Sequence, residues 1–243
     1  GLAGYWRVNG KSKSAICGKW INSPGRTLLK KLKKDLGTDY LPIIAEDLGV
    51  ITQDVEKLRK NSIVGTSSYR REYQLKMIRP DLKFKLIRGN IDSRIKKIYE
   101  KKYDAIILAK AGLKCLNMSS YITQEFNCKK IIPSAGQGII SLQVRKSDSA
   151  INRILKKINH KDTSLRANAE RRVLKILKGD CSTAVGIYSY INKKKLTLKG
   201  ELFSVDGKNR YYYEHSGRLD KALSIGTIVG KYLKKKSQGK YKN

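Results

Sequence analysis

Apolar and polar positions between residues 62 and 116 follow an order that predicts strands and helices in alternation. The predicted strands are "SIVGTSS", "FKLIRG" and "DAIILA". Each is followed by a predicted helix: "SYRREYQLKMI", "IDSRIKKIYEK" and "KAGLKCL". This alternation is typical of a parallel α/β sheet. Ligands bind beyond the carboxyl ends of strands in such sheets, so we expect the turns at 65–71 and 88–94 to face one crevice.

The remainder of the chain predicts a second, smaller unit. The glycine-rich stretch "IPSAGQGIISLQVR" is a loop that enters a strand. Periodicity then predicts helices over 147–158, 163–178 and 218–234, and strands over 184–191, 195–205 and 211–215. We expect a small α+β domain that ends in a solvated, frayed lysine-rich tail. Near the start of the chain, helices are predicted over 26–36 and 51–60, and a strand over 40–44.

Charge narrows the classes of ligand. The chain has 53 Lys and Arg against 20 Asp and Glu, a net charge of +33, which favours binding of polyanions or of a small substrate rich in carboxylates. A coding bias toward lysine is the plain alternative. Arginine placement is more informative, because a planar guanidinium grips carboxylate or phosphate in two places. Six arginines fall in one short segment: Arg59, Arg70, Arg71, Arg79, Arg88 and Arg94.

The remaining composition is that of a soluble, cytoplasmic protein. The chain is 40% apolar, and no apolar run has the length of a membrane span. No leader sequence is visible, so we expect a cytoplasmic protein. The four cysteines show no CxxC spacing, which predicts reduced thiols and no metal site.

Two turns are candidate anion sites. "GTSSYRR" places hydroxyls and two arginines at a predicted helix start, where free amides and the helix dipole favour an anion. "RGNIDSR" repeats this pattern with two arginines six residues apart. An ordinary helix cap with solvated arginines explains either turn alone, but two such turns in adjacent βα units are a more specific signal.

The stretch "KGDCSTAVG" places Cys181 in a tight turn between a helix and a strand. A single cysteine is commonly a small buried apolar residue. The position of Cys181 after a basic helix also allows a more accessible, reactive thiolate. Residues alone leave both interpretations open.

From about residue 62, the chain resembles the porphobilinogen deaminase (hydroxymethylbilane synthase) family. The resemblance rests on "VGTSSYRREYQLKMIRPDLKFKLIRGNIDSRIKKIYEKKYDAIILAKAGLK", on "IPSAGQGIISLQVR" and on "AERRVLKILKGDCSTAVG". It implies a periplasmic-binding-protein-like parallel α/β domain followed by a small α+β C-terminal domain. It also implies a monomeric transferase of tetrapyrrole and haem biosynthesis, with no specific nucleic-acid or membrane partner.

The resemblance assigns roles to particular residues. Cys181 would carry a covalent dipyrromethane cofactor on which four porphobilinogen units are joined with loss of ammonia. The acid side chains of cofactor and substrate would be bound by Ser68, Arg70, Arg71, Arg88, Arg94 and Arg171. Two positions depart from the family pattern: Cys115 replaces an arginine, and Asp180 replaces a glycine.

Upstream of residue 62 the resemblance changes. The first domain of the deaminase family, with its proton-transferring aspartate, is not recognised, so no catalytic residue is assigned. Residues 1–60 instead resemble the 4-alpha-glucanotransferase (amylomaltase) family in "GLAGYWRV", "AICGKWINSPG" and "LPIIAEDLGVITQDVEKLR". That resemblance would make Glu46 a general acid/base, although its partner carboxylates do not occur in this sequence.

The sequence therefore predicts three parts: a partial glucanotransferase-like segment (1–60), a deaminase-like α/β domain (61–146) and a cofactor-anchoring domain (147–243). With its first domain missing, the strand in 132–145 would expose an edge. Two other functions remain open, an inactive glucanotransferase fragment and a nonspecific binder of polyanions. A nonspecific binder of polyanions would bind nucleic acid with a strong dependence on salt concentration and no preference for nucleotide sequence.

Overall fold

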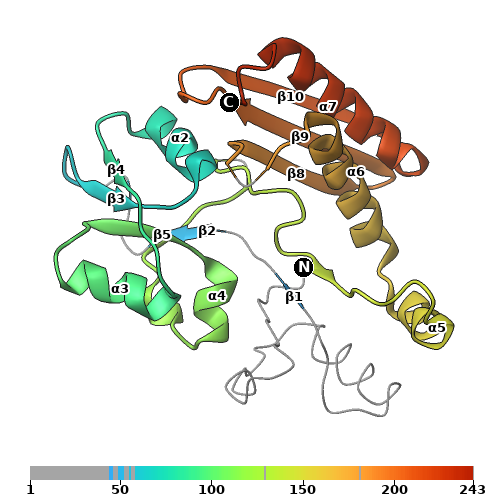
Figure 1. Cartoon of the computed structure of the whole chain (residues 1–243), viewed down its shortest axis with the longest axis horizontal. Helices are drawn as coiled ribbons and strands as arrows, with labels where there is room; N and C mark the ends of the chain where they lie inside the picture. The colour runs from blue at the N-terminus through green and yellow to red at the C-terminus, as the bar shows by residue number, and fades with distance from the viewer. Residues whose placement is uncertain are drawn as a thin grey trace.

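The computed structural model describes residues 44–45, 49–51, 55, 58–128, 130–180 and 182–242, with side chains throughout except in β1 and β2 and at residues 111 and 115. Two units contain most of the regular structure (Figure 1). The strands are β1 (Ile44–Ala45), β2 (Gly49–Ile51), β3 (Ile63–Gly65), β4 (Lys83–Lys85), β5 (Ala105–Ala109), β6 (Gln124–Glu125), β7 (Ile140–Ser141), β8 (Val185–Asn192), β9 (Lys195–Phe203) and β10 (Arg210–Arg218). The helices are α2 (Tyr69–Ile78), α3 (Ile91–Tyr99), α4 (Lys110–Cys115), α5 (Ser149–Ile158), α6 (Lys161–Leu177) and α7 (Ala222–Ser237), with short 3₁₀ helices at Ser119–Tyr121 and Leu219–Lys221.

The first unit is built on a five-stranded sheet in the order β4-β3-β5-β2-β6. Strand β3 runs parallel to β4 and β5, as predicted, because helices α2 and α3 connect these strands. The parallel α/β prediction did not include the other two strands of this sheet. Strand β2 is antiparallel to both β5 and β6, so the sheet is mixed.

Alternating side chains of β5 bury the two faces of this sheet separately. Ala105 and Ile107 belong to a core with Leu75 of α2, whereas Ile106 and Leu108 pack in a core with residues of α3 and α4. Successive strand residues point to opposite faces, so helix α2 covers one side and helices α3 and α4 cover the other. Figure 1 shows this arrangement, with α2 on the side of the sheet nearer the second unit.

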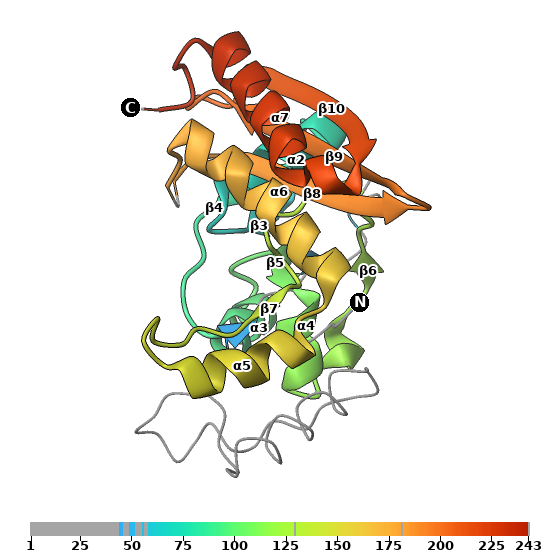
Figure 2. The same cartoon turned by 90° about the vertical axis from the view of Figure 1, so that its right-hand side faces the viewer.

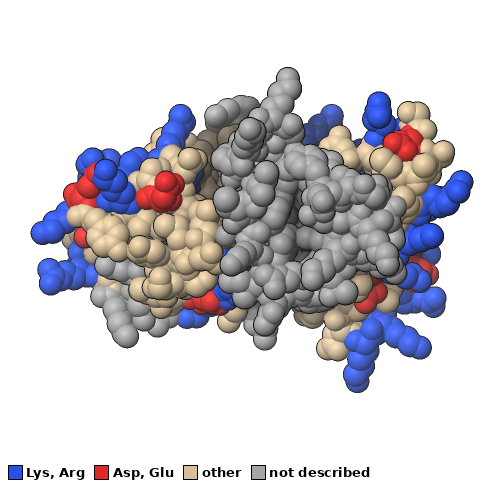
Figure 3. Space-filling model, turned by 90° about the horizontal axis from the view of Figure 1, so that it is seen from below, with Lys and Arg blue, Asp and Glu red and all other residues tan. Residues whose placement is uncertain are grey.

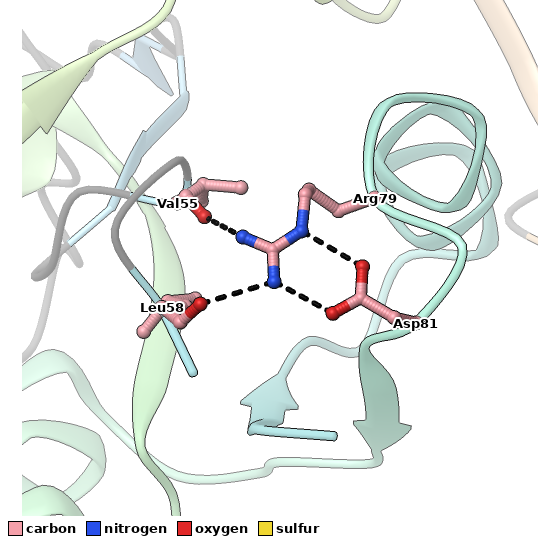
Figure 4. A network of polar contacts seen from close by, with 4 residues as sticks. All are labelled: Val55, Leu58, Arg79 and Asp81. Carbon is pink, nitrogen blue, oxygen red and sulfur yellow. Dashed lines mark hydrogen bonds and ion pairs between the residues drawn. The ribbon is translucent and has the colours of Figure 1, made fainter. Parts of the chain in front are cut away.

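The segment before β3 is tied to the end of α2 by one arginine (Figure 4). Arg79 forms a two-point ion pair with Asp81, with distances of 2.8 Å from Nε and 2.6 Å from Nη2. Its guanidinium also donates to the carbonyls of Val55 (2.6 Å) and Leu58 (3.0 Å). The planar fork of arginine can bind a carboxylate and two carbonyls at once, which a lysine ammonium cannot do in this geometry.

The second unit is an antiparallel sheet in the order β10-β9-β8, covered on one face by α6 and α7. The two helices lie side by side across the sheet (Figure 2). They approach so closely at Gly226 that a Cβ there would lie 2.3 Å from the carbonyl oxygen of Ala169. Only glycine permits this crossing. The predicted α+β C-terminal domain is confirmed in its elements.

The end of the chain corrects one prediction. Helix α7 continues to Ser237 rather than ending at 234, and Tyr241 is buried in the core of the second unit. The Tyr241 hydroxyl donates to the carbonyl of Leu177 (2.8 Å), and Val205 N donates to the Lys240 carbonyl (2.9 Å). The tail is therefore packed and not frayed. The tyrosine supplies an apolar ring and a polar tip, which the lysine-rich composition obscured.

The strand predicted within 132–145 is confirmed only at Ile140–Ser141, where β7 pairs antiparallel with β1. The helix predicted over 26–36 lies outside the described residues, as does much of 40–60. Strand β2 and Val55 come from the range 1–60 and join the sheet and core of the first unit. No helix in the described part of the chain is both long and apolar enough to cross a membrane.

Candidate functional site

The first predicted turn forms the start of α2. Ser68 is the N-cap, and its hydroxyl accepts a hydrogen bond from Arg71 N (3.4 Å). The hydroxyl of Thr66 in turn accepts from Ser68 N (3.2 Å). A serine at this position satisfies one of the free amides of the first turn and leaves others facing outward.

The two arginines of this turn have different surroundings. Arg70 is buried and donates from Nη1 to the carbonyl of Ile132 (2.7 Å), and burial lowers its pKa to about 9. Its side chain therefore still carries a positive charge at neutral pH. Arg71 is half-buried and donates to the Ile107 carbonyl of β5 (3.3 Å). The turn thus holds one cation in the interior and one against the central strand β5.

The second predicted turn follows β4. Arg88 is exposed, and Arg94 of α3 donates from Nε to the carbonyl of Gly89 (2.7 Å). Partial burial lowers the pKa of Arg94. Residue 65 of β3 pairs in parallel register with Lys85 and with Ile106, so both turns lie at the carboxyl edge of the sheet, as expected.

A cleft lies between α2 and the segment that leads to the second unit. Its lining combines two guanidiniums and one amide with apolar side chains: Arg70, Arg71, Gln137, Leu75, Ile107, Phe126, Ile131 and Pro133. The structure thus brings Arg70 and Arg71 together. Among the described residues, neither Arg88, Arg94 nor Arg171 belongs to this lining. Arg171 lies exposed on α6.

The cysteine turn is described on both sides of Cys181, whereas Cys181 itself lies outside the described residues. One carboxylate oxygen of Asp180 accepts from Ser182 N (2.9 Å), Ser182 Oγ (2.5 Å) and Thr183 N (3.1 Å). These hydrogen bonds, led by that from Ser182, lower the pKa of Asp180. A charged carboxylate therefore stands next to the thiol in the sequence and braces the turn.

Two other predicted positions are Glu46 and Cys115. Glu46 lies outside the described residues, and nothing is described of the side chain of Cys115 at the end of α4. Within the described ranges, no three His, Cys, Asp or Glu side chains are grouped so that they could hold a metal ion.

Charge on the surface agrees with binding of an acidic ligand. Lysine and arginine side chains project from both sides of the face seen from below (Figure 3). The cleft is small, with room for about one water molecule (about 10 Å³), so it fits at most a carboxylate head group and not a pyrrole ring. Its two guanidiniums suit the acid arms that a dipyrromethane carries.

Two family models match the chain in sequence order. The model described as "Porphobilinogen deaminase, dipyromethane cofactor binding domain" matches residues 32–153, and the model of the porphobilinogen deaminase C-terminal domain matches residues 164–235. The chain belongs to the porphobilinogen deaminase family. The predicted family and its dipyrromethane cofactor are confirmed. Because the first match begins at residue 32, it includes "LPIIAEDLGVITQDVEKLR", so the glucanotransferase interpretation of that stretch finds no support.

Curated relatives carry the same name. A porphobilinogen deaminase of Clostridium acetobutylicum is 37% identical over 209 residues, which are 82% of this chain and 70% of the relative. One of an Exiguobacterium species is 38% identical over 186 residues (76% and 59%). One of Buchnera aphidicola is 42% identical over 156 residues (64% and 50%). The chain thus spans between half and about 70% of the length of these relatives.

Two buried polar residues of this structure were not singled out from the sequence. Gln74 and Glu170 are both buried and bind the backbone between the two units. The sequence did contain a signal that Glu170 is buried. Glu170 lies on the same helix face as the apolar residues Ala169, Val173 and Leu177, and it is the only acidic residue between Asp162 and Asp180. A lone carboxylate on an apolar face must have buried donors.

Proposed function

We propose that this chain is a hydroxymethylbilane synthase of tetrapyrrole biosynthesis that joins porphobilinogen units on a dipyrromethane attached to Cys181. The observation that carries this proposal is the small cleft in which Arg70 and Arg71 lie beside an apolar wall. Family membership supplies the substrate class, and the cleft supplies groups that suit its carboxylates.

Individual residues of this chain would bind different parts of the cofactor and substrate. Arg70 and Arg71 would bind acid arms in the cleft, while Ser68, Arg88 and Arg94 would bind others along the same sheet edge. Dipyrromethane, when bound, would supply the pyrrole carbon to which the first porphobilinogen unit is joined as ammonia leaves, and each later unit would join the one before it. Cys181 would hold it by a thioether, which suits the soft, nucleophilic sulfur of a thiolate. Arg171 of α6 would bind a further acid arm of the cofactor or substrate.

Three further points belong to the same proposal. The change from the α/β domain (61–146) to the anchoring domain (147–243) would fall between β7 and α5. The protein would act as a monomer in the cytoplasm, where a cysteine stays reduced and free to form a thioether. The segment 1–60 would contribute β2 to the sheet rather than act on glucans.

The test is conversion of porphobilinogen by the purified protein, with Arg71→Lys as the variant and Arg59→Lys as the control. Lysine keeps the charge but loses the fork, and a charge-assisted hydrogen bond is worth about 1.5–3 kcal/mol, so KM should rise about 10- to 100-fold in Arg71→Lys. Arg59 is exposed, and its variant should resemble the wild type. Failure of the wild type to consume porphobilinogen, or equal KM values for both variants, would count against the proposal.

A further inference from the structure

Residues 132–136 form a crossing segment between the two units. Ile132 and Pro133 are buried, and this stretch has no regular secondary structure. Buried backbone amides and carbonyls outside helices and sheets must find other partners, because leaving them unpaired is costly. The partners of the crossing segment come from both units.

On the side of α2, the partner is Gln74. Its amide donates from Nε2 to the Ile132 carbonyl (2.9 Å) and accepts from Ile132 N (2.6 Å), so one side chain satisfies both backbone groups. The same carbonyl accepts from Arg70 Nη1. Gln74 and Arg70 are four residues apart on α2 and therefore share one face of the helix.

On the side of the second unit, the partner is Glu170. Its Oε2 accepts from Gly136 N (2.7 Å), while Oε1 accepts from Ser189 N (2.9 Å) and Ser189 Oγ (2.5 Å). Gly136 has a φ of 73°, a conformation that favours glycine and presents its amide to the carboxylate. Close by, the Pro133 carbonyl accepts from Ile187 N of β8 (2.7 Å).

These contacts connect the two halves of the candidate site. Helix α2 begins with Ser68, Arg70 and Arg71, and helix α6 carries Glu170 and leads into the turn that contains Cys181. We propose that Gln74 and Glu170 are positioning residues that hold the crossing segment from its two sides and so fix the arginine turn of α2 relative to the cysteine turn. This inference rests on the proposed function for its catalytic consequence, but not for its structural one.

The role requires these particular side chains. Glutamine offers an NH₂ group that donates and a carbonyl oxygen that accepts, which match the two backbone groups of Ile132. Glutamate offers two acceptor oxygens, which match donors on the crossing segment and on β8. Glu170→Gln would turn an NH₂ group toward one of these donors, and Gln74→Met would keep the length of the side chain while removing both hydrogen bonds.

The test measures hydrogen exchange at the amides of Ile132 and Gly136 in Gln74→Met, Glu170→Gln and the double variant. Loss of a hydrogen bond should speed exchange at the bound amide about tenfold. Because both residues hold one segment, each single variant should also speed exchange at the other amide, and the double variant should show less than the sum of the two effects. Lys76→Met on α2 and Lys175→Met on α6 are exposed controls and should change neither amide.

The inference would be overturned if each single variant speeds exchange only at the amide that the replaced residue binds, and if the effects of the two single variants add up in the double variant. If Glu170→Gln does not fold, Ser189→Ala removes one donor to the carboxylate and should still speed exchange at Gly136. The second readout is the fraction of protein with dipyrromethane on Cys181, which should fall in both single variants at unchanged secondary structure. A wild type that takes up no dipyrromethane contradicts the proposed function, and the exchange data then decide the inference alone.

Discussion

At the scale of single residues, the buried carboxylates differ most from what their sequence positions suggest. Glu170 lies in a helix with a strongly basic exposed face, yet it is 3% exposed and accepts hydrogen bonds from two other segments of the chain, at Gly136 and at Ser189. Burial raises its pKa, while hydrogen bonds from Ser189 and Gly136 and the charge of Arg166 oppose that rise. Desolvation is the larger effect, so ionised Glu170 costs the folded protein free energy.

The pH dependence of stability follows from this sign. A carboxyl group whose pKa is higher in the folded than in the unfolded protein stabilises least when it is ionised in both states. As the pH rises from about 4.5, the ordinary value for a glutamate, through the raised pKa, wild type should lose unfolding free energy relative to Glu170→Gln. Urea unfolding of both proteins between pH 4.5 and 7.5 measures the difference. Wild type gaining on the variant over this range would show that the carboxylate is net stabilised when charged.

Sequence could predict the polar residues of the two turns but not those that bind the crossing segment. Ser68, Arg71, Arg88 and Arg94 occur in short motifs at helix starts, where the chemistry is local. Gln74 and Glu170 act through partners 58 and 34 residues away, and such pairings depend on tertiary structure. Arg70 belongs to both sets of residues. The sequence predicts that it binds an anionic ligand, and its guanidinium also donates to the Ile132 carbonyl of the crossing segment.

At the scale of elements, the packing of α6 on α7 depends on Gly226. Replacing glycine by alanine in a helix usually gains about 1 kcal/mol of intrinsic stability. Here the new methyl group would lie 2.3 Å from the Ala169 carbonyl oxygen and 2.8 Å from Arg172 Cβ, so the helices must separate. Overpacking of this kind costs about 1–3 kcal/mol or more.

The contact is with a backbone oxygen, which cannot rotate away, so the cost should lie in the upper part of this range, at about 2–3 kcal/mol. After the gain of about 1 kcal/mol is subtracted, we expect Gly226→Ala to lower the free energy of unfolding by about 1–2 kcal/mol. Ser224→Ala on the exposed face of the same helix should change it by less than about 0.5 kcal/mol. Chemical denaturation of the two variants and wild type provides the measurement. A Gly226→Ala protein as stable as wild type would show that α6 and α7 can separate at no cost.

Periodicity predicted the long elements well, since α6, α7 and the three strands of the second unit carry their own apolar faces. It failed for β2 and β6, because strands of three and two residues are too short to show a period. The mixed sheet could not be predicted without them. The packed tail was missed because a single tyrosine, Tyr241, carries the contact in a lysine-rich stretch.

At the scale of the whole molecule, the two units contact each other around one helix. Besides the crossing segment, Tyr73 of α2 donates from its hydroxyl to the Val205 carbonyl (2.6 Å), and its ring lies 5.7 Å from that of Phe203. Helix α2 therefore both carries the arginines of the cleft and contacts the unit that bears the cysteine turn. A ligand held by both would be sensitive to the relative placement of the units.

The central claim is that Cys181 carries the cofactor, and the mass of the intact protein tests it most directly. Wild-type protein purified from cells that make porphobilinogen should be heavier than its sequence mass by one dipyrromethane, and proteolytic fragments should place the addition on Cys181. Cys181→Ser should show the unmodified mass. Unmodified wild-type protein that also takes up no pyrrole from preformed hydroxymethylbilane, or an addition that persists in Cys181→Ser, would contradict the account.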